Sequence, residues 1–219
     1  MNAMQRLHFA PLALAAVLAC TAPTVGAQAT SQPGVFVPAP EGTVLVYQRK
    51  SEGSYGQYEG PVRWTIGQRD WNGRKLVSST SERHGIQLLD PGNHAIVAQL
   101  SSDGQPLMSF NPPMAYEWPL AVGKAWRGVY ELTRYTPPML SSLTIDYKVE
   151  TLEEVSVPAG RFMAYKVVTT NSLGETDQTW TVPSLGIGTL KVVRDRPANH
   201  PLGPGHLEGV LVSRSLPPQ

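Results

Sequence analysis

Alternation of apolar and polar positions is the dominant pattern of the chain after residue 40. Val62, Trp64 and Ile66 alternate with polar or small neighbours, and the same two-residue period returns over residues 126–132 and 143–149. Successive side chains of a β-strand point to opposite faces, so this period predicts strands with one buried face. No stretch beyond the N-terminal segment has the period of an amphipathic helix.

Turn-forming residues separate the alternating stretches. Asn72-Gly73 is the strongest hairpin signal in the chain. Further turn sequences lie at residues 90–93, 102–104 and 171–174. Residues 111–113, Asn-Pro-Pro, are interpreted as a break between strands. Together these signals predict an all-β protein, an antiparallel curved sheet of roughly 10–12 strands that forms a barrel or half-barrel. A β-sandwich is the alternative, and little helix is expected beyond the signal peptide.

The N-terminal residues have the features of a secretion signal. A polar start precedes an apolar run over residues 9–18, which is too short to span a bilayer. Small residues at positions 25–29 suit an ordinary signal peptidase, which would remove a signal peptide of residues 1–29. Alternatively, residues 17–20, Val-Leu-Ala-Cys, resemble the lipobox of bacterial lipoproteins, with Cys20 as the candidate lipid attachment site. Processing at either site predicts that the protein is exported from the cytoplasm.

The chain after the signal divides into a linker and a domain. Residues 21–40 are rich in Ala, Thr, Pro and Gln, and we expect a flexible tether there. Residues 41–219 then form a single β-rich domain without a disulfide, because Cys20 is the only cysteine. These features predict a periplasmic or secreted protein, or alternatively an outer-membrane lipoprotein anchored at Cys20.

Charge excludes one class of partner. The chain has 18 Lys and Arg residues against 17 Asp and Glu residues. Because there is no basic excess, nucleic acid is not an expected partner. A lipid anchor is the only membrane attachment expected, because no hydrophobic run beyond the signal is long enough to cross a bilayer as a helix. The sequence leaves the oligomeric state open.

The sequence carries no recognisable catalytic or metal-binding constellation. His200 and His206 lie in a Pro/Gly-rich stretch without a zinc motif, and we interpret them as solvated loop residues. Ser54 lacks the surroundings of a nucleophilic serine. Glu175 and Asp177 share one face of an expected strand, which we interpret as a solvated edge that opposes aggregation. We therefore predict no catalytic residue, no metal, no cofactor and no enzymatic activity.

Aromatic residues are numerous for one β-domain, with five Trp and eight Tyr. Trp64, Trp126 and Trp180 lie in alternating strands and most simply fill the core. A barrel with such a lining can also enclose an apolar ligand. The sequence names no ligand-binding residue, and we expect a filled or shallow interior.

Residues 157–162, Val-Pro-Ala-Gly-Arg-Phe, form the clearest single turn motif. The proline presets the backbone for the second turn position, and the glycine suits the fourth. We expect Phe162 to close the end of the core where the chain reverses. Arg161 and Lys166 fit rim positions with buried stems and need no ligand to explain them.

This turn, Trp180 and the corner at residues 183–188 together resemble the TapB-like family, a set of bacterial envelope proteins of unknown function. The resemblance covers residues 40–195, although Thr181 and Val182 stand where relatives often carry a second aromatic residue. It implies a secreted or lipid-anchored β-rich protein. By analogy with curved half-barrels, it also suggests lipid or lipoprotein cargo in the periplasm.

Three functional hypotheses follow. The first is a non-catalytic periplasmic or outer-membrane-associated protein that binds an apolar small molecule or an envelope component. The second is a structural or assembly module without a pocket, whose partner is an envelope protein. The third and least supported is an envelope hydrolase. It requires convergence in one cleft of residues from the set Glu175, Asp177, His200 and His206.

Overall fold

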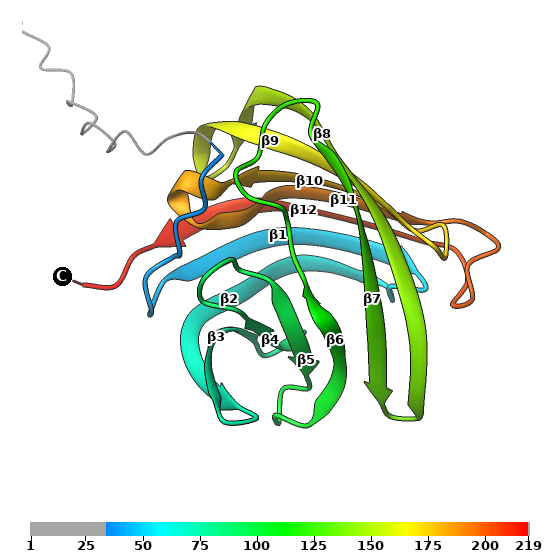
Figure 1. Cartoon of the computed structure of the whole chain (residues 1–219). Helices are drawn as coiled ribbons and strands as arrows, with labels where there is room; N and C mark the ends of the chain where they lie inside the picture. Colours follow the sequence, from blue (N-terminus) through cyan, green and yellow to red (C-terminus); the bar gives the residue numbers. More distant parts are fainter. Residues whose placement is uncertain (1–33, 219) are drawn as a thin grey trace, which may run out of the picture. The chain divides into compact units, whose positions relative to one another are not determined.

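The computed structural model describes residues 34–218, which form a closed barrel of twelve antiparallel strands (Figure 1). The strands are β1 (Val44–Gly53), β2 (Tyr58–Trp71), β3 (Arg74–Ser81), β4 (Gly85–Leu89), β5 (Ile96–Leu100), β6 (Pro106–Met114), β7 (Ala125–Tyr135), β8 (Pro138–Val157), β9 (Gly160–Asn171), β10 (Thr176–Val182), β11 (Ile187–Arg196) and β12 (Gly205–Ser215). The all-β prediction is confirmed, and of its alternatives the barrel is the correct one. The predicted signal peptide and Cys20 lie outside the described residues.

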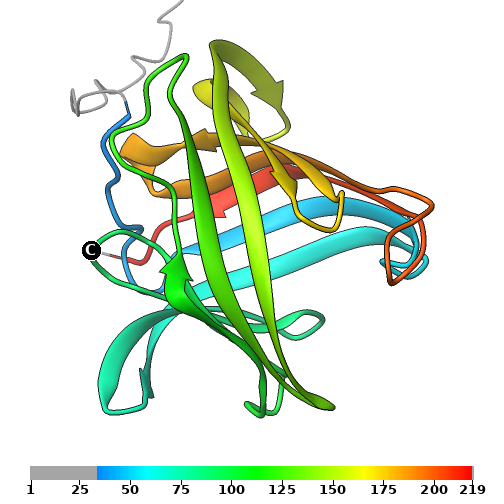
Figure 2. The same ribbon diagram turned by 45° about the vertical axis from the view of Figure 1, so that its right-hand side comes forward.

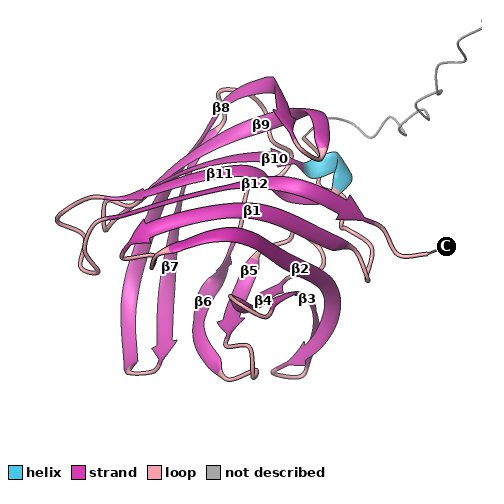
Figure 3. Ribbon diagram, turned by 180° about the vertical axis from the view of Figure 1, so that it is seen from behind, coloured by secondary structure: helices cyan, strands magenta, loops and turns pink. Residues whose placement is uncertain are grey.

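Each strand pairs with its neighbours in sequence, and the last strand returns to the first (Figure 2). β1 and β12 close the barrel along a ladder that runs from Val44 opposite Ser215 to Gly53 opposite Gly205. Short connections make this up-and-down order the natural outcome, because antiparallel neighbours can be joined by tight turns. Within residues 34–218 the single helical element is a 3₁₀ turn, η1 (Pro183–Leu185), between β10 and β11 (Figure 3). No helix among the described residues is long and apolar enough to cross a membrane.

The strongest turn predictions are confirmed. Asn72 and Gly73 have φ values of 48° and 74°, so both central residues of the β2–β3 hairpin adopt the left-handed conformation that this turn type requires. Val157 pairs with Gly160, which makes Pro158 and Ala159 a two-residue turn between β8 and β9. Local turn chemistry therefore sets the register of these two hairpins.

The expected break at residues 111–113 is wrong, because β6 continues through it to Met114. The pairing of β6 with β5 is irregular here, since Ser109 lies opposite Ala98 whereas Met114 lies opposite Ile96. Pro112 and Pro113 fall in this irregular part, where a residue without an N–H group can be tolerated.

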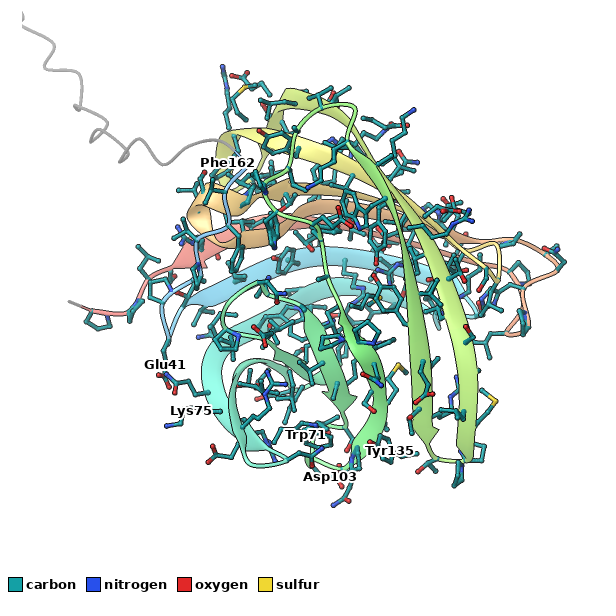
Figure 4. All side chains as sticks on the ribbon, in the orientation of Figure 1. Glu41, Trp71, Lys75, Asp103, Tyr135 and Phe162 are labelled. Carbon is teal, nitrogen blue, oxygen red and sulfur yellow. The ribbon has the colours of Figure 1, made fainter. Side chains whose placement is uncertain are left out.

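Three clusters of buried apolar residues stabilise the barrel. One centres on Tyr147 and Val167, one on Trp180 and Leu190, and one on Leu88. Phe162 lies beside the β8–β9 hairpin and packs, half-buried, against the second cluster (Figure 4). It borders that cluster and is not fully enclosed by it. Lys166 forms an ion pair with Glu150 at 2.9 Å, whereas Arg161 is exposed.

Residues 34–39 cross one end of the barrel. The carbonyl of Gly34 accepts a hydrogen bond from the N–H of Leu120 at 2.9 Å, and the N–H of Val37 donates to the carbonyl of Pro183 at 2.9 Å. The ring of Phe36 stacks on that of His94 with 4.8 Å between centroids. The segment thereby joins the connections that follow β4, β6 and β10. This part of the expected tether packs on the barrel, and the rest lies outside the described residues.

Candidate functional site

Two adjoining cavities occupy the interior of the barrel. The Trp64 chamber has a volume of about 390 Å³ and the Tyr116 chamber about 380 Å³. Eight residues line both of them: Gln87, Leu89, His94, Gln99, Thr179, Gly188, Thr189 and Arg194. Each volume falls in the range of roughly 300–1,000 Å³ that is usual for small-molecule sites. The expectation of a filled or shallow interior is wrong, because twelve strands enclose more space than the eight whose side chains just fill a barrel.

Apolar side chains form one part of the Trp64 chamber's wall, and polar side chains form the rest. Val62, Trp64 and Ile66 of β2 point into it, which places the alternation seen in the sequence on the inner face. Phe36 closes part of it, so the segment at residues 34–39 is a wall of the cavity. Ser79 adds a polar group to this wall. The chamber suits a molecule that has both an apolar and a polar part.

Phe110, Tyr116, Trp118 and Tyr147 contribute aromatic rings to the wall of the Tyr116 chamber. Tyr116 makes edge contacts with Trp118, Trp126 and Tyr147 at centroid distances of 5.6–6.1 Å. Trp126 stacks on Tyr147 with 4.8 Å between centroids. Such pairs hold ring orientations more firmly than apolar contact alone.

The three tryptophans singled out in the sequence have different roles. Trp64 lines its chamber, and Trp126 packs behind Tyr147 of the second chamber. Trp180 lies on the opposite face of β10 from the lumen, since Asp177 and Thr179 point inward. The prediction that tryptophans fill the core holds for Trp180, which is buried in the second apolar cluster. Trp64 packs, partly buried, against the same cluster and also lines its chamber, and Trp126 packs against the first cluster.

Glu175 and Asp177 do not form a solvated edge, because both line the Tyr116 chamber. The guanidinium of Arg194 donates through Nε to Oδ2 of Asp177 at 2.7 Å. Arg196 donates through Nε to Oε2 of Glu175 at 2.5 Å, and the Tyr55 hydroxyl donates to the same oxygen at 2.7 Å. Two ion pairs thus face the lumen.

These contacts hold the carboxyl group of Glu175 in its charged form near neutral pH. Burial alone would raise the pKa of Glu175, but the Tyr55 hydrogen bond and the positive charges of Arg194 and Arg196 outweigh it and lower that pKa. The pKa of Arg194 is raised despite burial, because the charges of Asp177 and Glu175 stabilise the guanidinium. A carboxylate that is already neutralised by arginine is a weak candidate for acid–base catalysis.

Arg49 and His84 form a further polar group at the Trp64 chamber. Nη1 of Arg49 lies 3.0 Å from Nε2 of His84. Arginine can only donate, so Nε2 of His84 accepts and its proton resides on Nδ1. Burial, together with the charges of Arg49 and Arg83, lowers the pKa of His84 to about 4, so His84 is neutral at pH 7.

His200 and His206 are not the two solvated loop residues that we predicted. His200 is buried in the β11–β12 loop, where its Nδ1 accepts a hydrogen bond from the N–H of Leu202 at 3.1 Å. His206 lies on β12, opposite Asp195, whose carboxylate is 2.7 Å from its Nδ1. Neither histidine lines either chamber. The convergence that the hydrolase hypothesis requires is therefore not found among these residues.

Metal-binding geometry is also lacking in the described part of the chain. Within residues 34–218, no three His, Cys, Asp or Glu side chains come together as potential ligands.

His94 should make the stability of the barrel depend on pH. Burial lowers the pKa of His94 to about 4, against an ordinary value of 6.5. Between pH 6.5 and pH 4, His94 binds a proton in the unfolded chain but stays neutral in the folded chain. The contribution of His94 to the free energy of unfolding is therefore full above pH 6.5 and is lost as the pH falls towards 4. Between pH 8 and pH 5 the free energy of unfolding should fall by about 2 kcal/mol through this residue.

Urea unfolding of the protein and of His94→Asn at pH 8 and pH 5 measures this effect. Asparagine suits the replacement because residue 94 has a φ of 60°, which asparagine tolerates. The pKa of His206 is raised by its hydrogen bond to Asp195, so its contribution has the opposite sign. Both His206 and His84 are present in the two proteins, so the difference isolates His94. An equal loss of stability in both proteins would contradict the prediction.

The lumen arginines were missed at the sequence level, although a signal for them exists. Arg49 shares the face of Leu45 and Tyr47 on β1, and Arg194 shares the face of Val192 on β11. A charged residue at an alternate position among inward-facing apolar residues of a strand indicates a polar group inside the barrel.

Comparison with known proteins identifies structural similarities only. A scan against protein-family models finds no match, and neither does a search of curated proteins. The TapB-like resemblance therefore stays a prediction.

Three solved structures are similar to this chain. A protein from Bacteroides fragilis, described as exported and as having a YmcC-like fold, has a TM-score of 0.48 and 14% identity; 83% of this chain and 99% of that chain are covered. A protein from Parabacteroides distasonis, described as a lipoprotein, has a TM-score of 0.45 and 13% identity, with 84% and 100% covered. The hypothetical lipoprotein YmcC from Escherichia coli has a TM-score of 0.43 and 10% identity, with 81% and 85% covered. At these values the similarities do not define a function.

Proposed function

We propose that this barrel binds a small, largely apolar molecule in the bacterial envelope and does no chemistry on it. The pair of adjoining chambers inside the barrel carries this proposal, because each has the volume of a small-molecule site and each offers apolar and aromatic side chains beside polar ones. A module without a pocket would have no need for such a lining. The arginine-paired state of Glu175 and Asp177 also favours binding over hydrolysis.

Location in the envelope rests on the sequence. The N-terminal secretion signal supports a periplasmic or secreted protein, and the lipobox-like residues before Cys20 support the alternative of an outer-membrane lipoprotein. A tether would let a lipid-anchored barrel reach cargo away from the membrane.

Mass spectrometry of the protein, purified from the envelope of its own bacterium, tests both parts. Under native conditions we expect a fraction of molecules to carry an additional small mass that is released on denaturation. The denatured mass then reports the N-terminus: a chain that begins after the small residues at positions 25–29, or one with an acylated Cys20. Protein that is always free of ligand, and that also binds no fatty-acid or lipid probe, would remove the binding proposal.

A matched pair of variants locates the ligand. Gly209 on β12 lines the Trp64 chamber, and a Cβ atom there would touch only Val192 Cγ1 at 3.3 Å and the Gln48 carbonyl at 3.7 Å. Gly209→Leu should therefore fill the chamber and lower the ligand-bound fraction. Glu208→Leu places the same side chain on the exposed face of the same strand and should not change that fraction. Equal occupancy in both variants would place the ligand outside this chamber.

A further inference from the structure

The charged side chains of the lumen are paired, with one exception. Asp177 pairs with Arg194 and Glu175 with Arg196. Asp90, which lines the Trp64 chamber, pairs with Arg74 at 2.8 Å. Arg49 lines the same chamber, and no carboxylate among the described residues lies within ion-pair distance of it. Partial burial of a cation without an opposite charge costs free energy, and a negatively charged ligand group would offset that cost.

The guanidinium of Arg49 has hydrogen-bonding capacity that no described residue uses. Nη1 is occupied by His84, whereas Nε is buried and has no hydrogen-bond partner within residues 34–218. The Nε side of a guanidinium presents two parallel N–H groups, from Nε and Nη2, and these match the two oxygens of a carboxylate.

The surroundings of Arg49 are positive. Burial and the charges of Arg194 and Arg83 lower the pKa of Arg49 to about 10, which still leaves it charged at neutral pH. His84 contributes no charge, as described above. Arg83 is itself held over the ring of Tyr58 at 3.6 Å. An anion entering this region would therefore gain from several cations and meet no unpaired carboxylate.

Apolar surface begins directly beside this group. Trp64 stacks against His84 with 5.9 Å between ring centroids, and Val62 and Leu45 continue the wall. Charge at one point and apolar surface beyond it are the complement of an amphipathic molecule.

We infer that the Trp64 chamber takes an amphipathic carboxylate, whose head group pairs with Arg49 and whose hydrocarbon body lies along the wall formed by Trp64, Val62 and Leu45. This inference rests on the proposed function of the lumen and adds the chemical class of its ligand. A carboxylate fits better than a phosphate monoester, because a single unpaired guanidinium balances one negative charge.

Binding of decanoate and of decanol tests the inference, because the two probes differ only in the head group. Quenching of tryptophan fluorescence in the purified protein can follow both titrations. The protein should bind decanoate more tightly than decanol. Arg49→Met keeps an unbranched apolar stem but removes the guanidinium and its charge, and it should weaken decanoate binding roughly 10–100-fold while decanol binding stays within about twofold.

Two further variants define the effect. Arg49→Lys keeps the charge but lacks the two parallel N–H groups of a guanidinium. Its affinity for decanoate should lie between those of the unaltered protein and of Arg49→Met. Arg127→Met removes an exposed arginine on β7 that does not line either chamber, and it should bind both probes like the unaltered protein. Circular dichroism confirms the fold of each variant, and Arg49→Gln replaces Arg49→Met if the latter does not fold.

The outcomes separate this inference from the proposed function. Equal binding of the two probes, or an equal loss of both in Arg49→Met, overturns the carboxylate head group but leaves an apolar ligand in place. Failure of both probes to bind overturns the inference as well. The proposed function then depends on whether the protein from its own envelope carries a bound mass.

Discussion

Replacement of Asp177 by alanine is expected to lower the free energy of unfolding by about 3–5 kcal/mol. The Asp177 side chain is only 15% exposed, and it accepts hydrogen bonds from the Nε of Arg194 at 2.7 Å and from the Thr179 hydroxyl at 2.7 Å. Its removal leaves the guanidinium of Arg194 in the lumen with Glu175 as the remaining nearby anion. For a domain of this size, thermal unfolding should show a fall in melting temperature of roughly 10 °C.

Two controls separate this effect from a general loss of contacts. The double variant Asp177→Ala with Arg194→Met removes both charges, and it should recover much of the lost stability because an apolar pair needs no compensation. Asp146→Ala removes one partner of the exposed Arg127–Asp146 pair, which has a similar Nε–Oδ1 distance of 2.6 Å. We expect Asp146→Ala to melt close to the unaltered protein, because water already solvates both charges. If Asp177→Ala and Asp146→Ala melt alike, the lumen pair is not the stabilising element proposed here.

The Asp177–Arg194 pair also bears on ligand selection. Arg194 lines both chambers and would be a second anion site if it were free. Because Asp177 holds it, Arg49 remains the cation that is available to a head group. The two ion pairs at the Tyr116 chamber and the single unpaired Arg49 at the Trp64 chamber therefore divide the lumen into a neutralised part and a positive part.

Sequence patterns predicted the strands well because their causes are local. Alternation over Val62, Trp64 and Ile66 depends only on the geometry of one strand, and the Asn72-Gly73 turn depends on two backbone conformations. The break predicted at residues 111–113 was wrong because its cause is not local. Whether Pro112 ends a strand depends on the hydrogen bonds that its neighbours offer, and β5 offers none in regular register there.

The site could be predicted only in part, because distant partners decide which face of a strand is inside. The sequence placed Glu175 and Asp177 on one face, but their partners Arg196 and Arg194 lie 21 and 17 residues further along. Because both arginines lie on the neighbouring strand β11, Glu175 and Asp177 can face the lumen as paired charges. Chamber volume is likewise a property of strand number and closure rather than of any local motif.

Replacement of Gly85 by alanine is expected to destabilise the barrel by roughly 2–5 kcal/mol, the sum of backbone strain and overpacking. Gly85 begins β4 with a φ of +76°, a conformation that costs energy in any residue with a Cβ atom. A Cβ atom there would lie 2.1 Å from the carbonyl oxygen of Leu100, so the β4 and β5 backbones would have to separate. Ile86 pairs with Leu100 at this point, and the separation should loosen that end of the ladder.

Gly203→Ala supplies the matched control, because it isolates the strain. Gly203 has a φ of +81°, close to that of Gly85, but a Cβ atom there would meet nothing within 4 Å. Urea unfolding should therefore show a loss of about 1–2 kcal/mol for Gly203→Ala and a clearly larger loss for Gly85→Ala. Equal losses would mean that β4 and β5 can move apart at little cost. The position also bears on the lumen, because Gly85 directly follows His84, whose Nε2 lies 3.0 Å from Nη1 of Arg49. We therefore expect a barrel that relaxes at Gly85 also to disturb the orientation of Arg49.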